Sequence, residues 1–315
     1  MKSPRMCNRP SACVYRWAGD SSCWDRFYRG MDHAIPATPP PFDLVSPTVQ
    51  TAPVVFTSPH SGRQYPADFI EAARLDAHGL RRSEDSFVDE LFAGAQAAGA
   101  PLLCATFPRA YCDPNREPWE LDPSMFADDL PAWVNTTSAR VGAGLGTLAR
   151  VVASGEPIYR EKLPFSEAEF RVRHCWTPYH DMLAALIADT RRRFGACLLV
   201  DCHSMPAHAG RGTAPDIVLG DVHGTACSGR VTALVETLLS GMGYVVRRND
   251  PYAGGYITRH YGRPREGVHA LQIEIARSLY MDELKLVRRS GFAALQNDLS
   301  TLAIHLAQAA QGLLS

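Results

Sequence analysis

Short apolar runs alternate with longer amphipathic stretches from about residue 51 to the end of the chain. The apolar runs predict strands at residues 53–58, 101–107, 196–204, 244–248 and 268–276. Helical spacing predicts helices at residues 86–99, 166–195 and 226–243, and a last helix from near Asp282 towards Gln311. Strands separated by helices are typical of an α/β fold. We therefore expect a mostly parallel or mixed central sheet with helices on both faces.

End signals support the predicted helices. Ser166 and Glu169 have the spacing of a capping box, and Gly195 follows the last residues of the same helical stretch. Pro178 lies inside this stretch, where we expect it to interrupt the helix.

The first 50 residues differ from the rest. They contain Arg, Cys and Trp without a period, followed by the Pro-rich segment "IPATPPPFDLVSP". No apolar stretch among them resembles a secretory signal. We expect residues 1–50 to be a poorly structured Pro-rich extension, of which residues 1–30 are a tail or an upstream extension of the reading frame. Residues 51–315 then form a single α/β domain.

Composition narrows the functional classes. The 315 residues are 46% hydrophobic and 21% charged, and the net charge is -1, which is ordinary for a globular protein and favours neither nucleic acid nor an anionic membrane as a partner. No apolar run approaches the roughly 18 residues of a transmembrane helix. The nine cysteines include no CxxC pair. We expect reduced thiols in a cytoplasmic protein, with Cys202 as a core residue or a neighbour of the site.

Polar residues cluster where four predicted strands end. His60 follows the first strand, residues 109–116 follow the second, residues 201–204 end the third, and Glu274 lies in the last. In open α/β sheets, ligands bind beyond the carboxyl ends of the strands. We expect these four groups to converge.

Two of the clustered residues, His60 and His203, indicate a metal site. Two imidazoles and one carboxylate with an open fourth position form a catalytic zinc site. "RRSEDSF" supplies the carboxylate, from Asp85 or, in reserve, Glu84. Zn²⁺ is the expected ion, with another divalent metal as the alternative. The competing interpretation makes both histidines hydrogen-bonded residues of the core, and His223 in "GDVHG" is a weaker candidate ligand.

Glu274 places a carboxylate in the otherwise apolar strand "LQIEIA". A buried carboxylate must find a partner or raise its pKa. Beside a metal-bound water, such a group acts as a general base. The alternative is a structural ion pair with Arg277.

Two further segments offer groups that bind anions. "PRAYCDPNREP" places Asn115 and Arg116 in a Pro-bounded loop, and a guanidinium grips a carboxylate through two parallel hydrogen bonds. "NDPYAGGYITRHYGRP" is a Gly-rich segment with Tyr256 and Arg259. The alternative is that both arginines are ordinary surface residues.

Taken together, these segments resemble the N-formylglutamate amidohydrolase (N-formylglutamate deformylase) family. The matching pieces, between residues 55 and 283, are "SPHSGRQYP", "EDSFVDEL", "DPNREP", "VDCHSMP", "DIVLGD", "NDPYAGGYITRHYG" and "LQIEIARSLYMDE". The resemblance implies a phosphorylase/hydrolase-like fold related to the zinc carboxypeptidases and aspartoacylases. It also implies a zinc site of two His and one acidic residue, a Glu base on a late strand, and an Asp-x-Asn-Arg segment that orients the substrate carboxylate. These roles fall on His60, Asp85 or Glu84, His203, Glu274, Asn115 and Arg116.

One feature departs from the zinc carboxypeptidases, which take a His and the acidic ligand from HxxE. Three residues after His60 stands Arg63, so the acidic ligand must come from further along the chain.

The resemblance implies hydrolysis of N-formyl-L-glutamate to formate and L-glutamate, a late step of histidine degradation, and hence a small acidic substrate. One alternative is an amidohydrolase or carboxypeptidase-like enzyme that acts on another acidic N-acyl amino acid. Another is a non-catalytic binder of small acidic metabolites. The oligomeric state is left open.

Overall fold

The computed structural model describes residues 13–15, 40–207 and 214–314. Its centre is an eight-stranded sheet with strand order β1-β2-β4-β3-β5-β8-β6-β7. The strands, in that order, are Cys13–Tyr15, Phe42–Ser46, Leu102–Ala105, Val54–Ser58, Cys197–Met205, Val268–Ala276, Ile217–Gly220 and Val246–Arg248. A separate hairpin joins β9 (Met281–Asp282) and β10 (Val287–Arg288).

The four central strands β4, β3, β5 and β8 run parallel, which confirms the predicted α/β class. The outer strands make the sheet mixed, because β2 is antiparallel to β4 and β6 is antiparallel to β8. Strands β1, β2 and β6 of this sheet are missing from the predicted set.

The N-terminal boundary differs from the expected one. Strand β2 pairs with β4 from Phe42 onwards, so the sheet includes residues before position 51. Its four registered pairs with β4 bring part of the Pro-rich segment into the sheet. Apart from residues 13–15, the expected tail of residues 1–30 lies outside the described residues.

Nine α-helices accompany the sheet in the described residues. They are α2 (Ala67–Ala72), α3 (Ala77–Arg81), α4 (Val88–Leu91), α5 (Ala139–Gly142), α6 (Phe165–Arg171), α7 (Thr177–Phe194), α8 (Gly229–Gly241), α9 (Tyr256–Tyr261) and α10 (Phe292–Leu313). Among the described residues, none of the helices has the length and apolarity needed to cross a membrane.

Several predicted helix boundaries were wrong. The stretch 86–99 contains only the short α4 and a 3₁₀ turn at Ala93–Ala95. The final helix starts at Phe292, because Asp282 belongs to the β9–β10 hairpin. Gly195 does end α7 in the left-handed conformation, as its position predicts.

The predicted helix 166–195 is divided into three parts. A π-helical turn at Val172–Trp176 separates α6 from α7, and Pro178 lies in the first turn of α7, where proline is tolerated. Pro164 precedes α6 without a side-chain cap, so the expected capping box at Ser166 does not form.

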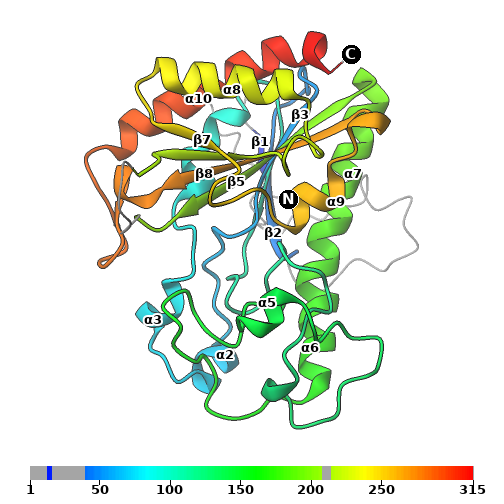
Figure 1. Cartoon of the computed structure of the whole chain (residues 1–315), viewed down its shortest axis with the longest axis vertical. Coiled ribbons are helices and arrows are strands. Elements are labelled where there is room, and N and C mark those ends of the chain that lie inside the picture. The colour runs from blue at the N-terminus through cyan, green and yellow to red at the C-terminus, as the bar shows by residue number, and fades with distance from the viewer. Residues whose placement is uncertain (1–12, 16–39, 208–213, 315) are drawn as a thin grey trace, which may run out of the picture.

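Hydrophobic side chains alternate between two cores, one on each face of the sheet. In β3, Val54 and Phe56 contact the core under α8 and α10, whereas Val55 contacts the core under α7. Figure 1 shows α8 and α10 along one face of the sheet and α7 beside the other. With both faces covered, the polar ends of the central strands remain the place for a site.

The loop after β3 lies very close to the end of β4. A Cβ atom built on Gly62 would stand 2.0 Å from the carbonyl oxygen of Phe107, and the backbone N–H of Gln64 donates to Thr106 at 2.9 Å. Only glycine allows this approach. The contact fixes the loop that carries His60.

We expect Gly62→Ala to destabilise the protein by about 1–3 kcal/mol, because the added methyl group must displace backbone rather than a flexible side chain. Gly142→Ala in α5 is the matched control, since nothing lies within 4 Å of the added atom. Urea unfolding midpoints measure the difference. Equal midpoints for the two variants would contradict the close contact.

Candidate active site

The carboxyl ends of the parallel strands bring the predicted polar residues together. His60 follows β3, residues 113–116 follow β4, and His203 and Glu274 lie near the ends of β5 and β8. In the β5–β8 register His203 is opposite Glu274. Residues opposite each other in a ladder point to the same face, so these two side chains are neighbours.

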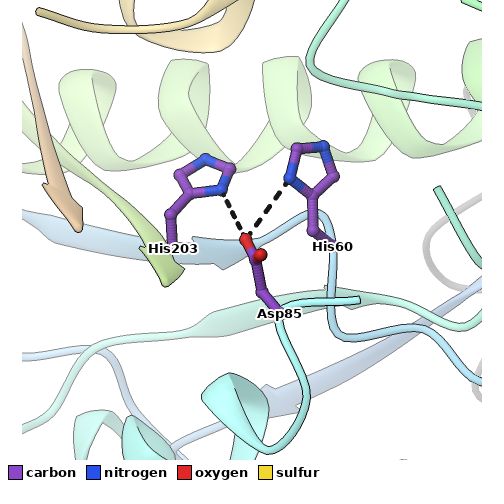
Figure 2. A group of neighbouring side chains, drawn as sticks. All are labelled: His60, Asp85 and His203. Atoms are coloured by element: carbon purple, nitrogen blue, oxygen red, sulfur yellow. Dashed lines mark hydrogen bonds and ion pairs between the residues drawn. The ribbon is translucent and has the colours of Figure 1, made fainter. Parts of the chain in front are cut away.

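Three buried side chains, His60, Asp85 and His203, form the centre of this region. Asp85 Oδ2 lies 3.0 Å from His203 Nδ1 and 3.4 Å from His60 Nδ1. Figure 2 shows both imidazoles directed at this one oxygen from different segments. One donor atom from each residue lies within 4.8 Å of the other two, so the group could hold a metal ion.

Two further carboxylates hold the far nitrogens of the imidazoles. His60 Nε2 lies 2.7 Å from Asp113 Oδ1, and His203 Nε2 lies 2.9 Å from Asp201 Oδ1. A carboxylate accepts hydrogen bonds, so each Nε2 carries the proton. Asn115 Nδ2 is also 3.0 Å from His203 Nε2, but an amide nitrogen can only donate, so it cannot accept the Nε2 proton and Asp201 is the acceptor.

This arrangement leaves three lone pairs facing one another in a buried space. With Nε2 protonated, a neutral imidazole presents the lone pair of Nδ1, and both Nδ1 atoms face a carboxylate oxygen. His60 Nδ1 is buried and has no hydrogen-bond partner among the described residues. These buried lone pairs need a positive partner, which can only be a cation or an added proton. Imidazoles oriented by carboxylates are the usual surroundings of a metal ion.

Charges in this centre shift the neighbouring pKa values. Burial raises the pKa of Asp85, but its interactions with His203 and His60 outweigh burial and hold it well below its usual range. Burial lowers the pKa of His203, but Asp201 and Asp85 outweigh that effect and raise it well above its usual range. Protons on the imidazole therefore take the place of a cation when none is bound.

The two candidate acidic ligands differ in orientation. Glu84 is buried but accepts hydrogen bonds from Arg81, Tyr65 and Ser86, away from the imidazoles. Asp85 donates its backbone N–H to the carbonyl of His60 at 3.0 Å, which joins the two loops. Of the two, the structure brings Asp85 to the histidines.

Arg277 contacts the opposite oxygen of Asp85. Its Nη2 lies 3.1 Å from Asp85 Oδ1, and it also forms an ion pair with Glu283. The alternative pairing of Arg277 with Glu274 is therefore not the arrangement found. Arg277 instead orients Asp85, with Oδ2 towards the imidazoles.

Glu274 is almost completely buried beside His203. Gln272 Nε2 donates to its Oε1 at 2.9 Å. Burial raises the pKa of Glu274 to about 7, with His203 acting in the opposite direction and Asp85 adding to the rise. A carboxyl group with a pKa near neutrality can accept and release a proton under physiological conditions.

The loop after β4 presents Asn115 and Arg116. Arg116 Nε donates to the carbonyl of Leu145 at 2.9 Å and Nη1 donates to that of Asn115 at 2.7 Å. Its Nη2 is 3.9 Å from Asp113 Oδ2, too far for a hydrogen bond. Burial lowers the pKa of Arg116 to about 10, so the guanidinium remains charged at neutral pH. It has donors left for an anion.

The Gly-rich segment contributes differently from expectation. Tyr256 begins α9 and is half-buried, with its ring 5.6 Å from that of His180. Arg259 is exposed and is not brought to the cluster, because Ile257 and Thr258 occupy the inward face of α9. His223 is also exposed, and its backbone N–H donates to Asn249.

Several residues near the centre had no assigned role in the sequence prediction. Asp201 and Asp113 hold the imidazoles, and the spacing of Asp201 two residues before His203 on one strand was a usable signal. Arg109 donates to Asp113 Oδ2 at 2.8 Å; burial works against its charge, but Asp113, Asp85 and Glu274 outweigh burial and raise its pKa.

Tyr252 was a further residue without an assigned role. Partial burial raises its pKa, and the charges of Glu274, Arg277, Asp85 and Arg109 also act on it. The residue is 40% exposed. Its placement in a loop far along the chain left no local signal.

Comparison with known proteins gives consistent results. The model of the N-formylglutamate amidohydrolase family matches residues 52–281. An N-formylglutamate deformylase of Pseudomonas aeruginosa is 34% identical over 239 residues, which cover 73% of this chain and 83% of the relative. An N-formylglutamate deformylase of Pseudomonas putida is 30% identical, with 73% and 82% covered.

Solved structures agree. The crystal structure of N-formylglutamate amidohydrolase from Ralstonia eutropha superposes with a TM-score of 0.81 at 39% identity, over 85% of this chain and 97% of that one. A gene product of Agrobacterium tumefaciens shares the fold, with a TM-score of 0.54 at 20% identity over 84% and 90% of the two chains. Because the family model covers more than half of the chain and both deformylases match most of their length, the chain belongs to the N-formylglutamate amidohydrolase family.

Proposed function

We propose that this protein is a metal-dependent amidohydrolase that converts N-formyl-L-glutamate and water to formate and L-glutamate, a step of histidine degradation. The observation that carries the proposal is the buried cluster His60, Asp85 and His203 with Glu274 on the adjacent strand. The names of the relatives supply the substrate, which is a small dicarboxylate. No specific observation favours a non-catalytic binder.

The donor set favours zinc as the ion. Two imidazole nitrogens from His60 and His203 and one oxygen from Asp85 are the three protein ligands typical of catalytic zinc sites. Zinc bound there would lower the pKa of a water molecule and polarise the formyl oxygen. Asp113 and Asp201 orient the two imidazoles for this role.

Glu274 is the proposed general base. Its carboxylate, on the same face as His203, takes a proton from the attacking water and then gives it to the nitrogen that leaves as the amine of glutamate. Burial supports this role because it raises the pKa of Glu274 to about 7, where the carboxylate can both accept and release a proton at neutral pH.

Arg116 and Asn115 are the proposed binders of a substrate carboxylate, with Tyr256 beside their loop. The charged guanidinium of Arg116 has a free Nη2, suited to a carboxylate oxygen. Arg109, held by Asp113 and under the influence of Glu274, is placed to stabilise negative charge that develops on the formyl oxygen. Arg259 is no longer part of this proposal, because it is exposed.

Metal analysis tests the ligand set. Protein freed of metal should bind about one zinc ion per chain, and His60→Ala, His203→Ala and Asp85→Asn should each abolish that uptake. Glu84→Gln is the matched control and should keep the ion, because Glu84 points to Arg81. Calorimetry in buffers of different ionisation enthalpy should show proton release, since His203 must lose its added proton. If Glu84→Gln lost zinc and Asp85→Asn kept it, Glu84 rather than Asp85 would be the acidic ligand.

Glu274 also predicts a pH dependence of stability. Its pKa is about 7 in the folded protein and ordinarily 4.5, so the fold favours the protonated form. The resulting stabilisation is complete below pH 4.5 and is lost as the pH rises through 7. We compare the free energies of unfolding of metal-free Glu274→Gln and wild type. The value for the variant minus that for wild type should rise by roughly 2 kcal/mol as the pH increases from 5.5 to 8.5. Urea unfolding measures this gain, and Glu161→Gln at an exposed position is the control. A difference that stays constant with pH would contradict the buried acid.

Turnover tests the proposed reaction. Product release from N-formyl-, N-acetyl- and N-succinylglutamate should be fastest for the formyl compound, should stop with a chelator and should return with zinc. Glu274→Gln should lower kcat by about 10²- to 10⁴-fold while keeping its metal. Activity that survives complete metal removal, or preference for another acyl group, would refute the corresponding part of the proposal.

A further inference from the structure

Residues 114–116 carry the proposed substrate-binding side chains, and their three successive carbonyl oxygens are all hydrogen-bonded. His180 Nε2 lies 2.8 Å from the carbonyl of Pro114, Arg116 Nη1 donates to that of Asn115, and Trp176 Nε1 donates to that of Arg116 at 3.0 Å. Of the donors, Trp176 immediately precedes α7 and His180 lies near its start. A backbone segment held at successive carbonyls has little freedom to turn its side chains.

The side chain of Asn115 is held from the opposite direction. Its Oδ1 accepts the backbone N–H of Ile257 at 2.8 Å, and its amide packs against Gly255, where a Cβ atom would stand 2.3 Å away. Its backbone N–H donates to Asp113 Oδ1 at 2.8 Å. Asn115 is therefore clamped between α7 and the turn before α9.

The tautomer of His180 suits this role. Burial lowers its pKa to about 4, so the ring is neutral at pH 7 and has one donor and one acceptor. A carbonyl can only accept, so Nε2 carries the proton and donates to Pro114. Nδ1, 2.9 Å from the hydroxyl of Tyr261, is then the acceptor. The Pro114 carbonyl thus selects the tautomer that holds the loop, and the Tyr261 hydroxyl, which can donate or accept, is compatible with it.

Trp176 and His180 are also fixed against each other. Their rings stack with centroids 3.8 Å apart and an angle of 24° between planes, which their spacing of four residues on one helix face allows. The π-helical turn Val172–Trp176 ends at the first residue of this pair. Its extra residue changes the phase of α7 relative to α6 by about 100°, which sets the face that carries both rings.

We propose that Trp176 and His180 are positioning residues that hold the Asn115–Arg116 segment in place, so that Asn115 stays at His203 and the free guanidinium nitrogen of Arg116 stays available to a substrate carboxylate. The effect of this restraint on catalysis rests on the proposed function. The restraint of the Asn115–Arg116 segment by Trp176 and His180 does not, because it is a property of the loop itself.

Hydrogen exchange tests the restraint without activity. Trp176→Phe and His180→Phe keep an aromatic ring but lose the N–H donors. Exchange of the backbone amides of residues 113 and 115–117 should become about tenfold faster in both variants. The controls Trp133→Phe and His174→Phe change exposed rings that contact Trp119 and Phe170 instead, and they should leave this exchange unchanged. Unchanged exchange in Trp176→Phe and His180→Phe would overturn the proposal.

Kinetics test the consequence for the substrate. With N-formylglutamate, Trp176→Phe and His180→Phe should lower kcat/KM by about 10- to 100-fold, mainly through KM, and keep one metal ion per chain. His180→Gln places an amide donor at similar reach and should restore much of the loss. In an Arg116→Ala background, Trp176→Phe should have less than about a threefold effect, because the two residues act through one interaction.

The outcomes separate the two proposals. The loss of kcat/KM in the double variant could equal the product of the losses in Trp176→Phe and Arg116→Ala. Together with faster hydrogen exchange of the loop, that result would show that Trp176 does not act through Arg116 and would overturn its positioning role. Wild-type protein without activity on N-formylglutamate would refute the proposed function, while the exchange measurement would still decide whether the two rings hold the loop.

Discussion

Two imidazole nitrogens and a carboxylate oxygen face one another in a buried space, where only a cation or an added proton can lie between them. This constraint arises from the far side of each ring, where Asp113 and Asp201 accept hydrogen bonds from the protonated Nε2 atoms. Bringing three lone pairs together away from water is unfavourable unless positive charge lies between them. The rest of the site can be understood as a framework that keeps this arrangement from relaxing.

The framework is built from segments that meet only in three dimensions. The parallel strands β3, β5 and β8 supply His60, His203 and Glu274, and the Gly62 contact fixes the first of these to the end of β4. Four carboxylates (Asp85, Asp113, Asp201 and Glu274) are gathered there with three guanidinium groups (Arg109, Arg116 and Arg277). Burying so many charged groups lowers the stability of the fold. Their role therefore lies in binding and chemistry rather than in stability.

Periodicity and strand ends were sufficient to predict the α/β class and the convergence of His60, His203 and Glu274. The choice between Asp85 and Glu84 was not predictable, because adjacent residues in a loop point in directions that only tertiary contacts decide. Arg259 illustrates the opposite error, since a glycine-rich loop suggested an inward arginine but the short helix α9 turned it outward. The π-helical turn had no signal in the apolar pattern, which continues through it as one helix.

Arg277 occupies Oδ1 of Asp85, and this has a consequence for coordination number. If the cluster holds an ion, a carboxylate with one oxygen already engaged would bind it through the other oxygen alone, so the protein would contribute three donor atoms rather than four. Such a site suits small ions that accept few ligands, and it is poorly matched to calcium, which takes six to eight oxygen atoms. By engaging Oδ1, the arginine would leave coordination positions of such an ion open for small molecules and would disfavour cations that need many oxygen ligands.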